Sequence, residues 1–324
     1  MSAGEFDLIA AIAARAGVPR GDVLLGIGDD AALLAPPPGE ALCVCVDTLN
    51  AGVHFPESTA AFDIGWKALA VNLSDLAAMG AQPRWATLAL SLPASDPGLV
   101  EALIDGFLSL AEAHTVALVG GDTTRGPLSL SVTALGSVAP ERALRRAGAH
   151  AGDALYVSGT PGDAAAGLAL VQQRLACDDA QVRDALIGRL DRPTPRVALG
   201  LELAGLAHAA IDISDGLLAD LGHVLAASGV GATLALETLP VSTALRALLP
   251  QAELRWPLQL AGGDDYELLF CGPPERIEAL PAFARGEFTR IGRIEAAPGL
   301  RLTRRGEPLD WRPDRSGYEH FAVQ

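Results

Sequence analysis

The sequence predicts a protein of the α/β or α+β class with two domains. Segments with the character of strands alternate with segments of helical periodicity along the chain. The chain has 324 residues, 50% of them hydrophobic, and this length suggests about two domains at ~150 residues each. Residues 140–153 are richer in arginine and interrupt the apolar pattern. We therefore expect one domain over 1–145 and a second over 146–324.

The first domain is expected to follow the order β-α-β-α-β-β after a short helix that begins at the capping box of Ser2 to Glu5. The expected elements are, in order, 42–46, 62–79, 85–92, 97–113, 115–119 and 128–138. Two of these strands are expected to end on acids, at Asp47 and at Gly120-Gly121-Asp122. Acids in that position would lie where open α/β sheets bind their ligands. On the helix, Asn72 and Asp75 share one face.

The second domain centres on the stretch Asp212-Ile213-Ser214-Asp215-Gly216-Leu217. It follows the apolar run 209–211 and precedes a helical pattern, so a buried strand passes into an amphipathic helix through an acidic turn. We expect further strands at 154–157, 232–236 and 266–270, with helices from 161 through 207. Two carboxylates this close disfavour each other's ionisation unless a cation lies between them. A helix cap needs only one acid, so the presence of two acids favours a divalent metal site here.

Acidic turns recur along the chain. They contain Asp30, Asp47, Asp75, Asp122 and Asp264. Carboxylate oxygens suit Mg²⁺, which proteins often hold together with substrate phosphates, so we expect a phosphate site with several ions. For each turn taken alone, an Asx-turn or a helix cap explains the same residues. The repeated Asx-x-Ser-Asp pattern at 72–75 and 212–215 leaves open either a distant duplication or chance.

Composition excludes several classes of function. The net charge of -15 and a pI near 4.7 argue against a nucleic-acid or anionic-membrane partner.

No basic leader region or long apolar run is present, so we expect a cytoplasmic protein. The four cysteines lack CxxC spacing and are expected to be buried or partly buried thiols. Lys67 is the only lysine and lies in no P-loop motif, which excludes Walker-type and Schiff-base chemistry.

Six motifs in order resemble those of the thiamine-monophosphate kinases, a family within the aminoimidazole-ribonucleotide synthetase-like superfamily of ATP-using enzymes. They are Gly28-Asp29-Asp30-Ala31-Ala32, Asp47-Thr48-Leu49 with Gly52-Val53-His54-Phe55, Asn72 to Gly80, Gly120-Gly121-Asp122-Thr123, Asp212 to Leu217, and Gly262 to Leu268. The resemblance extends from about residue 4 to residue 321. It implies a two-domain PurM-like fold, with a mixed N-terminal sheet and a C-terminal α/β domain, and a homodimer built by the N-terminal sheets.

The resemblance also implies ATP-dependent phosphorylation of thiamine monophosphate to thiamine diphosphate, without a phosphorylated protein intermediate and hence without a catalytic nucleophile. The residues it assigns to Mg²⁺ are Asp30, Asp47, Asp75, Asp122, Asp212 and Asp215; those it assigns to ATP are Gly121, Asp122, Arg146 and Ser214; those it assigns to the thiamine substrate are His54, Asp264 and Tyr318. Taken alone, a lone histidine such as His54 is more often a hydrogen-bonded structural residue than a catalyst, and Arg146 is better explained as a solvated linker residue.

The sequence departs from the family pattern at two places. Cys45 and Val46 stand where hydroxyl residues are common, so only backbone carbonyls would remain as metal contacts there. Asp264 is one methylene shorter than the glutamate of many members. Two other functions stay open: another ATP-using member of the superfamily, such as a purine-intermediate synthetase or a hydrogenase-maturation protein, and a non-catalytic regulator that binds nucleotide or metal.

Overall fold

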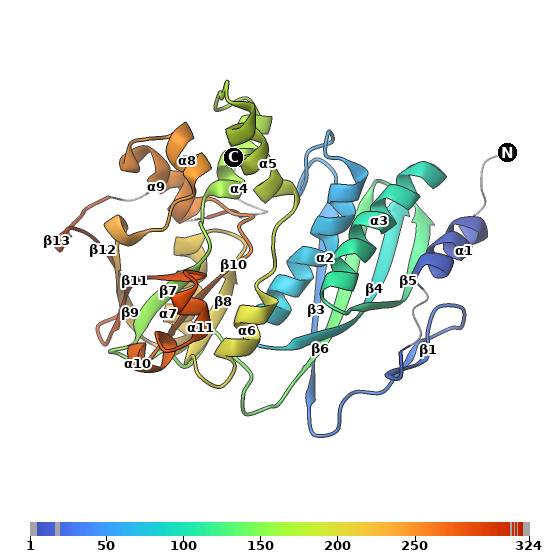
Figure 1. Cartoon of the computed structure of the whole chain (residues 1–324), viewed down its shortest axis with the longest axis horizontal. Helices are drawn as coiled ribbons and strands as arrows, with labels where there is room; N and C mark the ends of the chain where they lie inside the picture. Colours follow the sequence, from blue (N-terminus) through green and yellow to red (C-terminus); the bar gives the residue numbers. More distant parts are fainter. Residues whose placement is uncertain (1–4, 17–19, 312, 314, 316, 320–324) are drawn as a thin grey trace. The chain divides into compact units, whose positions relative to one another are not determined.

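The computed structural model describes residues 5–16, 20–311, 313, 315 and 317–319 (Figure 1). Their chain divides into two compact units, one within Met1–Leu76 and Ala81–Pro140 and the other within Ala77–Gly80 and Glu141–Gln324. Both units combine sheets with helices. No helix among the described residues is both long enough and apolar enough to cross a membrane.

The first unit is built on a mixed four-stranded sheet of order β3-β6-β4-β5, in which only β4 and β5 pair in parallel. The strands are β3 (Ala41–Asn50), β4 (Gln82–Leu92), β5 (Ala117–Arg125) and β6 (Ser129–Val138), and a small hairpin of β1 (Val23–Leu25) and β2 (Leu33–Leu34) precedes them. The mixed sheet and the predicted order β-α-β-α-β-β are both confirmed.

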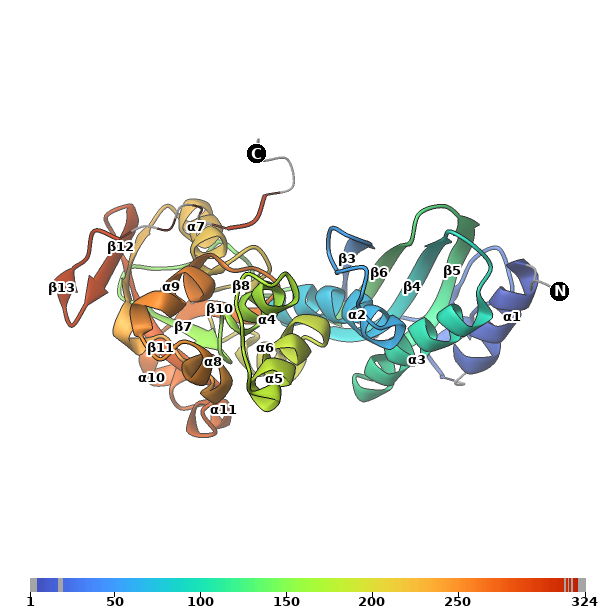
Figure 2. The same ribbon diagram turned by 90° about the horizontal axis from the view of Figure 1, so that it is seen from above.

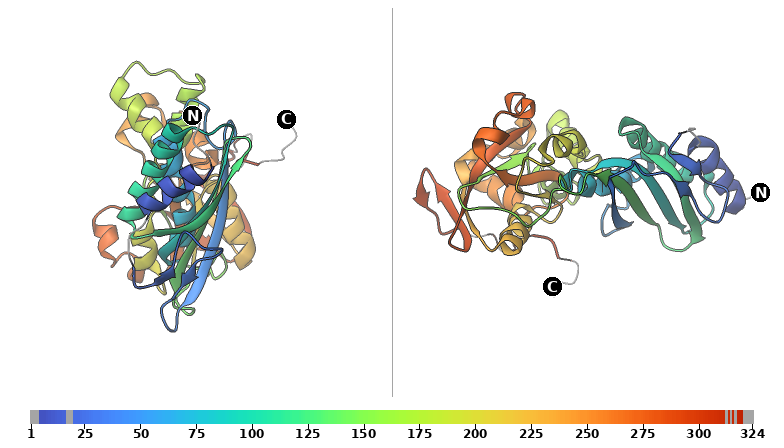
Figure 3. Two further views of the ribbon diagram at one scale, coloured as in Figure 1. Left: turned by 90° about the vertical axis from the view of Figure 1, so that its right-hand side faces the viewer. Right: turned by 90° about the horizontal axis from the view of Figure 1, so that it is seen from below.

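Helices α2 (Ala61–Ala78) and α3 (Pro97–Ala113) lie on one side of this sheet, and α1 (Glu5–Ala16) contacts α3 and β5 (Figures 2 and 3). Two glycines let α2 and α3 cross closely. A Cβ atom added to Gly65 would lie 1.8 Å from the carbonyl oxygen of Leu103, and one added to Gly106 would lie 1.8 Å from that of Phe62. The backbones therefore touch where any side chain would collide.

The second unit contains a seven-stranded sheet of order β13-β12-β9-β11-β7-β10-β8, antiparallel except for the β12 and β9 pair. Its strands are β7 (Ala154–Ser158), β8 (Ala209–Ile213), β9 (Gly231–Ala235), β10 (Glu267–Gly272), β11 (Phe288–Glu295), β12 (Gly299–Arg304) and β13 (Glu307–Pro308). Ile211, Ile213, Leu221 and Ile291 belong to the buried cluster between sheet and helix, which holds β8 and α7 (Leu217–Ser228) together.

The remaining helices of the second unit are mostly short. They are α4 (Asp163–Val171), α5 (Ala180–Asp191), α6 (Val197–Leu203), the 3₁₀ turn η1 (Leu236–Thr238), α8 (Thr243–Leu248), α9 (Ala252–Ala261), α10 (Pro274–Ile277) and α11 (Pro281–Ala284). Helix α4 packs on α5, and α9 contacts both α4 and α7. The loop after α9 therefore begins close to the start of α7.

Two predicted strand ends are wrong. The strand predicted to end on Asp47 continues as β3 to Asn50, with Asp47 opposite Val132 of β6. The strand predicted over 115–119 is β5, which runs through Gly120, Gly121 and Asp122 to Arg125. In both cases the neighbouring strand continues its ladder of hydrogen bonds, so an acid in the sequence does not end the strand.

Candidate active site

The acidic turn between β8 and α7 is shaped by a third acid. The N–H groups of Asp215 and Gly216 donate to Oδ2 of Asp220, at 3.2 and 3.1 Å. Burial, followed by the charges of Asp212 and Asp215, raises the pKa of Asp220 to about 7 against the opposing effect of the backbone hydrogen bonds. Asp212 itself is buried at the end of β8. The turn thus concentrates negative charge in a poorly solvated place.

The loop before β10 is fastened to this turn by backbone hydrogen bonds. The N–H of Asp264 donates to the Ser214 carbonyl oxygen at 2.9 Å, and the N–H of Tyr266 donates to that of Ile213 at 2.8 Å. Asp264 and Tyr266 both adopt left-handed backbone conformations, with φ of 67° and 50°, which are strained for residues with side chains. The strained loop holds the backbone of Asp264 beside the acidic turn.

Tyr318 reaches the same turn from the C-terminal end of the described chain. Its N–H donates to the Asp215 carbonyl oxygen at 3.0 Å. A Cβ atom on the preceding Gly317 would lie 2.7 Å from Cβ of Ala219, so this segment lies directly on the start of α7. Tyr318 is 51% exposed. The structure therefore brings Asp212, Ser214, Asp215, Asp264 and Tyr318 together within the second unit.

The other acids of the Gly262 to Leu268 motif have structural partners. Glu267 is fully buried and accepts hydrogen bonds from Arg189, from Ser158 and, at 2.6 Å to each oxygen, from Arg196. Both oxygens of Asp265 accept from the Gly162 N–H, at 2.9 and 2.8 Å. These two acids anchor the loop, and the Asp264 carboxylate accepts a hydrogen bond from the Tyr266 hydroxyl at 3.3 Å.

In the first unit, Asp47 and Asp75 approach a common neighbour. The Cys45 thiol on β3 packs on α2, with its sulfur 3.4 Å from the Asn72 carbonyl oxygen. Burial, and then the charges of Asp75 and Asp47, raise the pKa of this thiol, so both carboxylates lie near it. Burial also raises the pKa of Asp47. Val46 is 64% exposed on the opposite face of the strand, which places its side chain away from these acids.

Asp122 and Gly121 lie at the other edge of the same sheet. The register runs from Asp47 through Val132 and Leu88 to Gly121, a distance of three strand spacings or about 14 Å. Asp122 is exposed. A Cβ atom on Gly121 would lie 1.9 Å from the Leu88 carbonyl oxygen, so close strand pairing by itself requires glycine at this position. The structure thus separates Asp122 from Asp47 along the sheet.

His54 and Asp30 lie in loops of the first unit. Nδ1 of His54 accepts from the Asn50 N–H at 3.0 Å, and Nζ of Lys67 donates to the His54 carbonyl oxygen at 3.2 Å. Lys67 is buried, with 2% of its surface exposed. Asp30 is exposed, and its N–H donates to the Asp29 carboxylate. His54 therefore closes the loop that follows β3.

The backbone of Arg146 lies at the far end of α7 from the acidic turn. Its carbonyl oxygen accepts from the Ser228 hydroxyl at 3.3 Å. Ser228 ends a 12-residue helix that begins just after the turn, a length of about 18 Å. Arg146 is exposed. Within the second unit, the structure separates its backbone from Ser214 and Asp215.

The chain matches two family models, the N-terminal domain of AIR synthase related proteins over residues 28–138 and the C-terminal domain over 150–305. It is 50% identical to the thiamine-monophosphate kinase of Escherichia coli (strain K12) over 331 residues, which cover 100% of both chains. The chain belongs to the thiamine-monophosphate kinase family. The family member of Bacillus subtilis (strain 168) is 35% identical, over 98% of this chain and 99% of its own.

Solved structures of thiamine-monophosphate kinases have the same fold. The crystal structure of the enzyme from Stenotrophomonas maltophilia K279a matches with a TM-score of 0.85 and 55% identity, over 95% of this chain and 99% of its own. A structure described as AaThiL complexed with AMPPCP and TMP matches with a TM-score of 0.77 and 34% identity, over 98% and 97%. HypE, a hydrogenase maturation protein, shares the fold at 22% identity. The PurM-like two-domain fold is confirmed.

Sequence reasoning missed two residues that shape the sites of this thiamine-monophosphate kinase family member. Asp220 could have been found, because an acid in the first turn of a helix is the usual partner of free N–H groups. The sequence indicates only that Lys67 lies in no P-loop motif. Its role in holding the His54 loop gives no local signal, because 13 residues separate the donor from the acceptor.

Proposed function

We propose that the chain transfers the γ-phosphoryl group of ATP to thiamine monophosphate, forming thiamine diphosphate and ADP. The observation that carries this proposal is the 50% identity to a thiamine-monophosphate kinase over the full length of both chains. A relative at 34% identity is complexed with AMPPCP and TMP, which supports the same pair of substrates. The gathering of Asp264 and Tyr318 at the acidic turn supports a ligand site in the second unit.

Mg²⁺ fits the carboxylates of both units. Asp212 and Asp215 both lie close enough to Asp220 for their charges to raise its pKa. A divalent ion would offset this repulsion between like charges. In the first unit, Asp47 and Asp75 offer hard oxygen ligands next to Cys45, whose raised pKa keeps it a thiol and a poor ligand. We assign Asp30 and Asp122 to the same role. Bound Mg²⁺ would neutralise charge on the phosphates.

The remaining assignments concern the two substrates. For ATP we propose contacts from Gly121, Asp122, Arg146 and Ser214, and for the thiamine ester contacts from His54, Asp264 and Tyr318. Tyr318 exposes an aromatic face beside the turn, which suits stacking against the rings of a cationic thiamine. Asp264, held in place by its strained loop, offers a carboxylate of opposite charge to those rings.

We propose direct in-line transfer. An oxygen of the thiamine ester phosphate forms a bond to the γ-phosphorus as the bond to the bridging oxygen of ADP breaks, and the electron pair leaves with ADP. The acceptor phosphate is already ionised near neutral pH, so no protein base is needed. Burial raises the pKa values of Cys43, Cys45 and Cys271, which keeps these thiols protonated and poor nucleophiles.

The test is an ATP-consumption assay over a panel of phosphate acceptors, with product analysis. We expect ADP and thiamine diphosphate from thiamine monophosphate, and no turnover with unphosphorylated thiamine. Asp212→Asn should lower turnover at least about 100-fold, because it removes a carboxylate that we assign to Mg²⁺ and thereby weakens binding of the cation that would neutralise the phosphates. The exposed Asp184 on α5 provides the matched control, Asp184→Asn, which should keep full activity.

Three outcomes would contradict the proposal. Turnover only with a different acceptor would favour another activity of the superfamily, and ATP binding without turnover would favour a regulatory role. If Asp212→Asn unfolds, and Mg²⁺ does not raise the melting temperature of the natural chain, the acid is structural and the metal assignment is wrong.

We also propose that the first unit forms a homodimer and that the protein works in the cytoplasm. Strand β3 is an edge of its sheet, and three apolar side chains on one face of it are exposed, Leu42 at 49%, Val44 at 58% and Val46 at 64%. An apolar row on an unpaired edge strand favours association with another sheet. Two observations support this location. The four cysteines are free thiols, as is usual in a reducing compartment, and the proposed co-substrate ATP is abundant in the cytoplasm.

A further inference from the structure

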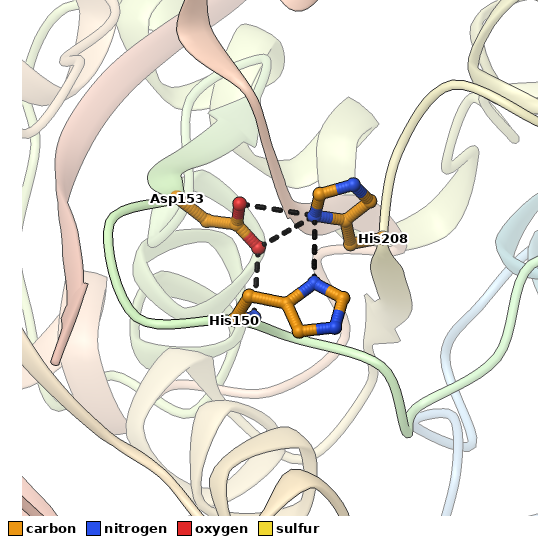
Figure 4. A group of neighbouring side chains, drawn as sticks. All are labelled: His150, Asp153 and His208. Carbon is orange, nitrogen blue, oxygen red and sulfur yellow. Dashed lines mark hydrogen bonds and ion pairs between the residues drawn. The ribbon is translucent and has the colours of Figure 1, made fainter. Parts of the chain in front are cut away.

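A second cluster of ligand-type side chains lies in the second unit, at the other end of β8 (Figure 4). It consists of His150 and Asp153, in the turn before β7, and of His208, directly before β8. Asp212 follows His208 by four residues of extended chain, or roughly 13 Å. The cluster is therefore separate from the acidic turn to which we assign Mg²⁺.

The three side chains converge on one point. Nδ1 of His208 lies 2.9 and 3.0 Å from the two carboxylate oxygens of Asp153, and 3.1 Å from Nδ1 of His150. The two imidazole rings stand almost perpendicular, at 85°. Ligands of a tetrahedral ion at bond lengths of about 2.0–2.2 Å are separated by about 3.3–3.6 Å. An ion would fit after these atoms move apart by a few tenths of an ångström.

Hydrogen bonding alone does not satisfy the cluster. Nδ1 of His208 faces a carboxylate on one side and a ring nitrogen on the other, and a neutral imidazole carries one proton to share between them. The Asp153 carboxylate already accepts a hydrogen bond from the backbone N–H of His150 at 2.9 Å. A cation would engage both ring nitrogens and the carboxylate through their lone pairs at once.

The backbone holds the three residues in place without a metal. The His208 N–H donates to the Cys271 carbonyl oxygen at 2.9 Å, which fixes it at the end of β10. The Ile294 N–H donates to the Asp153 carbonyl oxygen at 2.8 Å, and the Asp153 N–H donates to that of His150 at 3.0 Å. Two segments of chain are thus pinned to the sheet, and their ligand atoms are preorganised.

We propose that His150, Asp153 and His208 bind a divalent transition-metal ion of the zinc type. Two imidazoles and one carboxylate favour Zn²⁺, Co²⁺ or Ni²⁺ over Mg²⁺. The carboxylate is nearly buried, His208 is 31% exposed and His150 is exposed, so a water molecule can complete the coordination. The bound ion joins the turn at 150–153 to the start of β8 and stabilises the second unit against unfolding.

The test uses the full chain after treatment with a chelator, in excess Mg²⁺ so that the other carboxylates are occupied. Calorimetric titration with Zn²⁺ should show one site per chain. His150→Ala, at an exposed position, should weaken this site at least about 10-fold, and His208→Gln should do the same. His223, an exposed histidine on α7, provides the matched control, His223→Ala, which should bind as the natural chain does.

Two further readouts are independent of phosphoryl transfer. Zn²⁺ should raise the melting temperature of the natural chain and of His223→Ala, but not that of His150→Ala. Co²⁺ bound in place of Zn²⁺ should give the intense visible absorption of low-coordinate cobalt. Equal Zn²⁺ affinity in all variants, or displacement of Zn²⁺ by Mg²⁺, would overturn the proposal. If the histidine variants fail to fold, the Co²⁺ spectrum of the natural chain decides, and a weak octahedral spectrum would overturn the proposal.

Discussion

Asp265 is a buried acid whose proton links the stability of the second unit to pH. Burial raises its pKa well above the ordinary value, and the charge of Glu267 acts in the same direction, against the Gly162 hydrogen bonds. The folded-state pKa therefore lies above the unfolded one. The stability that its protonated form contributes is full below about pH 4, the pKa of an unfolded aspartate, and is lost as pH rises toward the folded-state pKa.

We expect Asp265→Asn to flatten the pH dependence of stability above about pH 4, where the unfolded chain loses this proton and the folded chain keeps it. As pH rises, the free energy of unfolding should fall more steeply for the natural chain than for the variant. The two slopes should differ by up to about 1.4 kcal/mol per pH unit, which is the value for one proton. Urea denaturation at several pH values measures both slopes. Asp184→Asn should keep the natural slope, and parallel slopes for Asp265→Asn would show that Asp265 is ionised in the folded protein.

Tyr318 provides a residue-scale test of substrate binding. Tyr318→Ala should raise the KM for thiamine monophosphate about 5- to 10-fold, in line with the loss of one aromatic contact, and leave the KM for ATP unchanged. Tyr318→Phe keeps the ring and should behave almost as the natural chain does. Equal losses for both substrates, or a loss in Tyr318→Phe as large as in Tyr318→Ala, would refute stacking.

Among the secondary-structure elements, the crossing of α2 and α3 depends on glycine. Gly106→Ala should destabilise the first unit by at least about 3 kcal/mol, because its Cβ would lie 1.8 Å from a backbone oxygen and one helix would have to move. Gly98 in the same helix has only an ordinary contact at 3.5 Å, so Gly98→Ala should be neutral or stabilising by up to about 1 kcal/mol. Chemical denaturation followed by circular dichroism measures both. A Gly106→Ala variant as stable as Gly98→Ala would contradict the close crossing.

Strands β3 to β10 were predictable from the sequence, whereas the hairpin β1–β2 and strands β11, β12 and β13 were not expected. Strand ends and exposed faces were not predictable. The run 42–46 is apolar throughout and predicts a strand, but nothing local indicates that Leu42, Val44 and Val46 face outward. The register with β6 carries the strand past Asp47 to Asn50. Backbone pairing with a distant strand decides both features, and that pairing has no signature in the run itself.

The candidate site was predictable in composition and less so in arrangement. The pattern Asx-x-Ser-Asp lies inside α2 at 72–75 and at a strand-to-helix turn at 212–215, so equal letters do not mark equivalent places, and the structure does not support a duplication. The backbone N–H groups of Asp264 and Tyr318 donate to the carbonyl oxygens of Ser214 and Asp215 at the turn. Contacts across 50 and 103 positions leave no periodic trace in the sequence.

For the whole molecule, the open prediction is the oligomeric state. We expect light scattering after size-exclusion chromatography to give twice the 33.3 kDa mass of one chain. Val44→Asp combined with Val46→Asp should give single chains, because charges on the exposed face of β3 would be desolvated in a dimer. Val53→Asp places a charge at an exposed loop position of the same unit and should leave the dimer intact. A natural chain that elutes as a monomer would refute the dimer.

The burial of Lys67 has a practical consequence for work with this protein. As the sole lysine, with its ammonium group enclosed against the His54 loop, it offers no reactive amine to reagents in solution. Succinimidyl dyes, amine-coupled sensor surfaces and lysine-directed crosslinkers should therefore leave Lys67 unmodified in the folded chain. Peptide mass spectrometry of a labelled sample would find a tag on Lys67 only after the first unit unfolds.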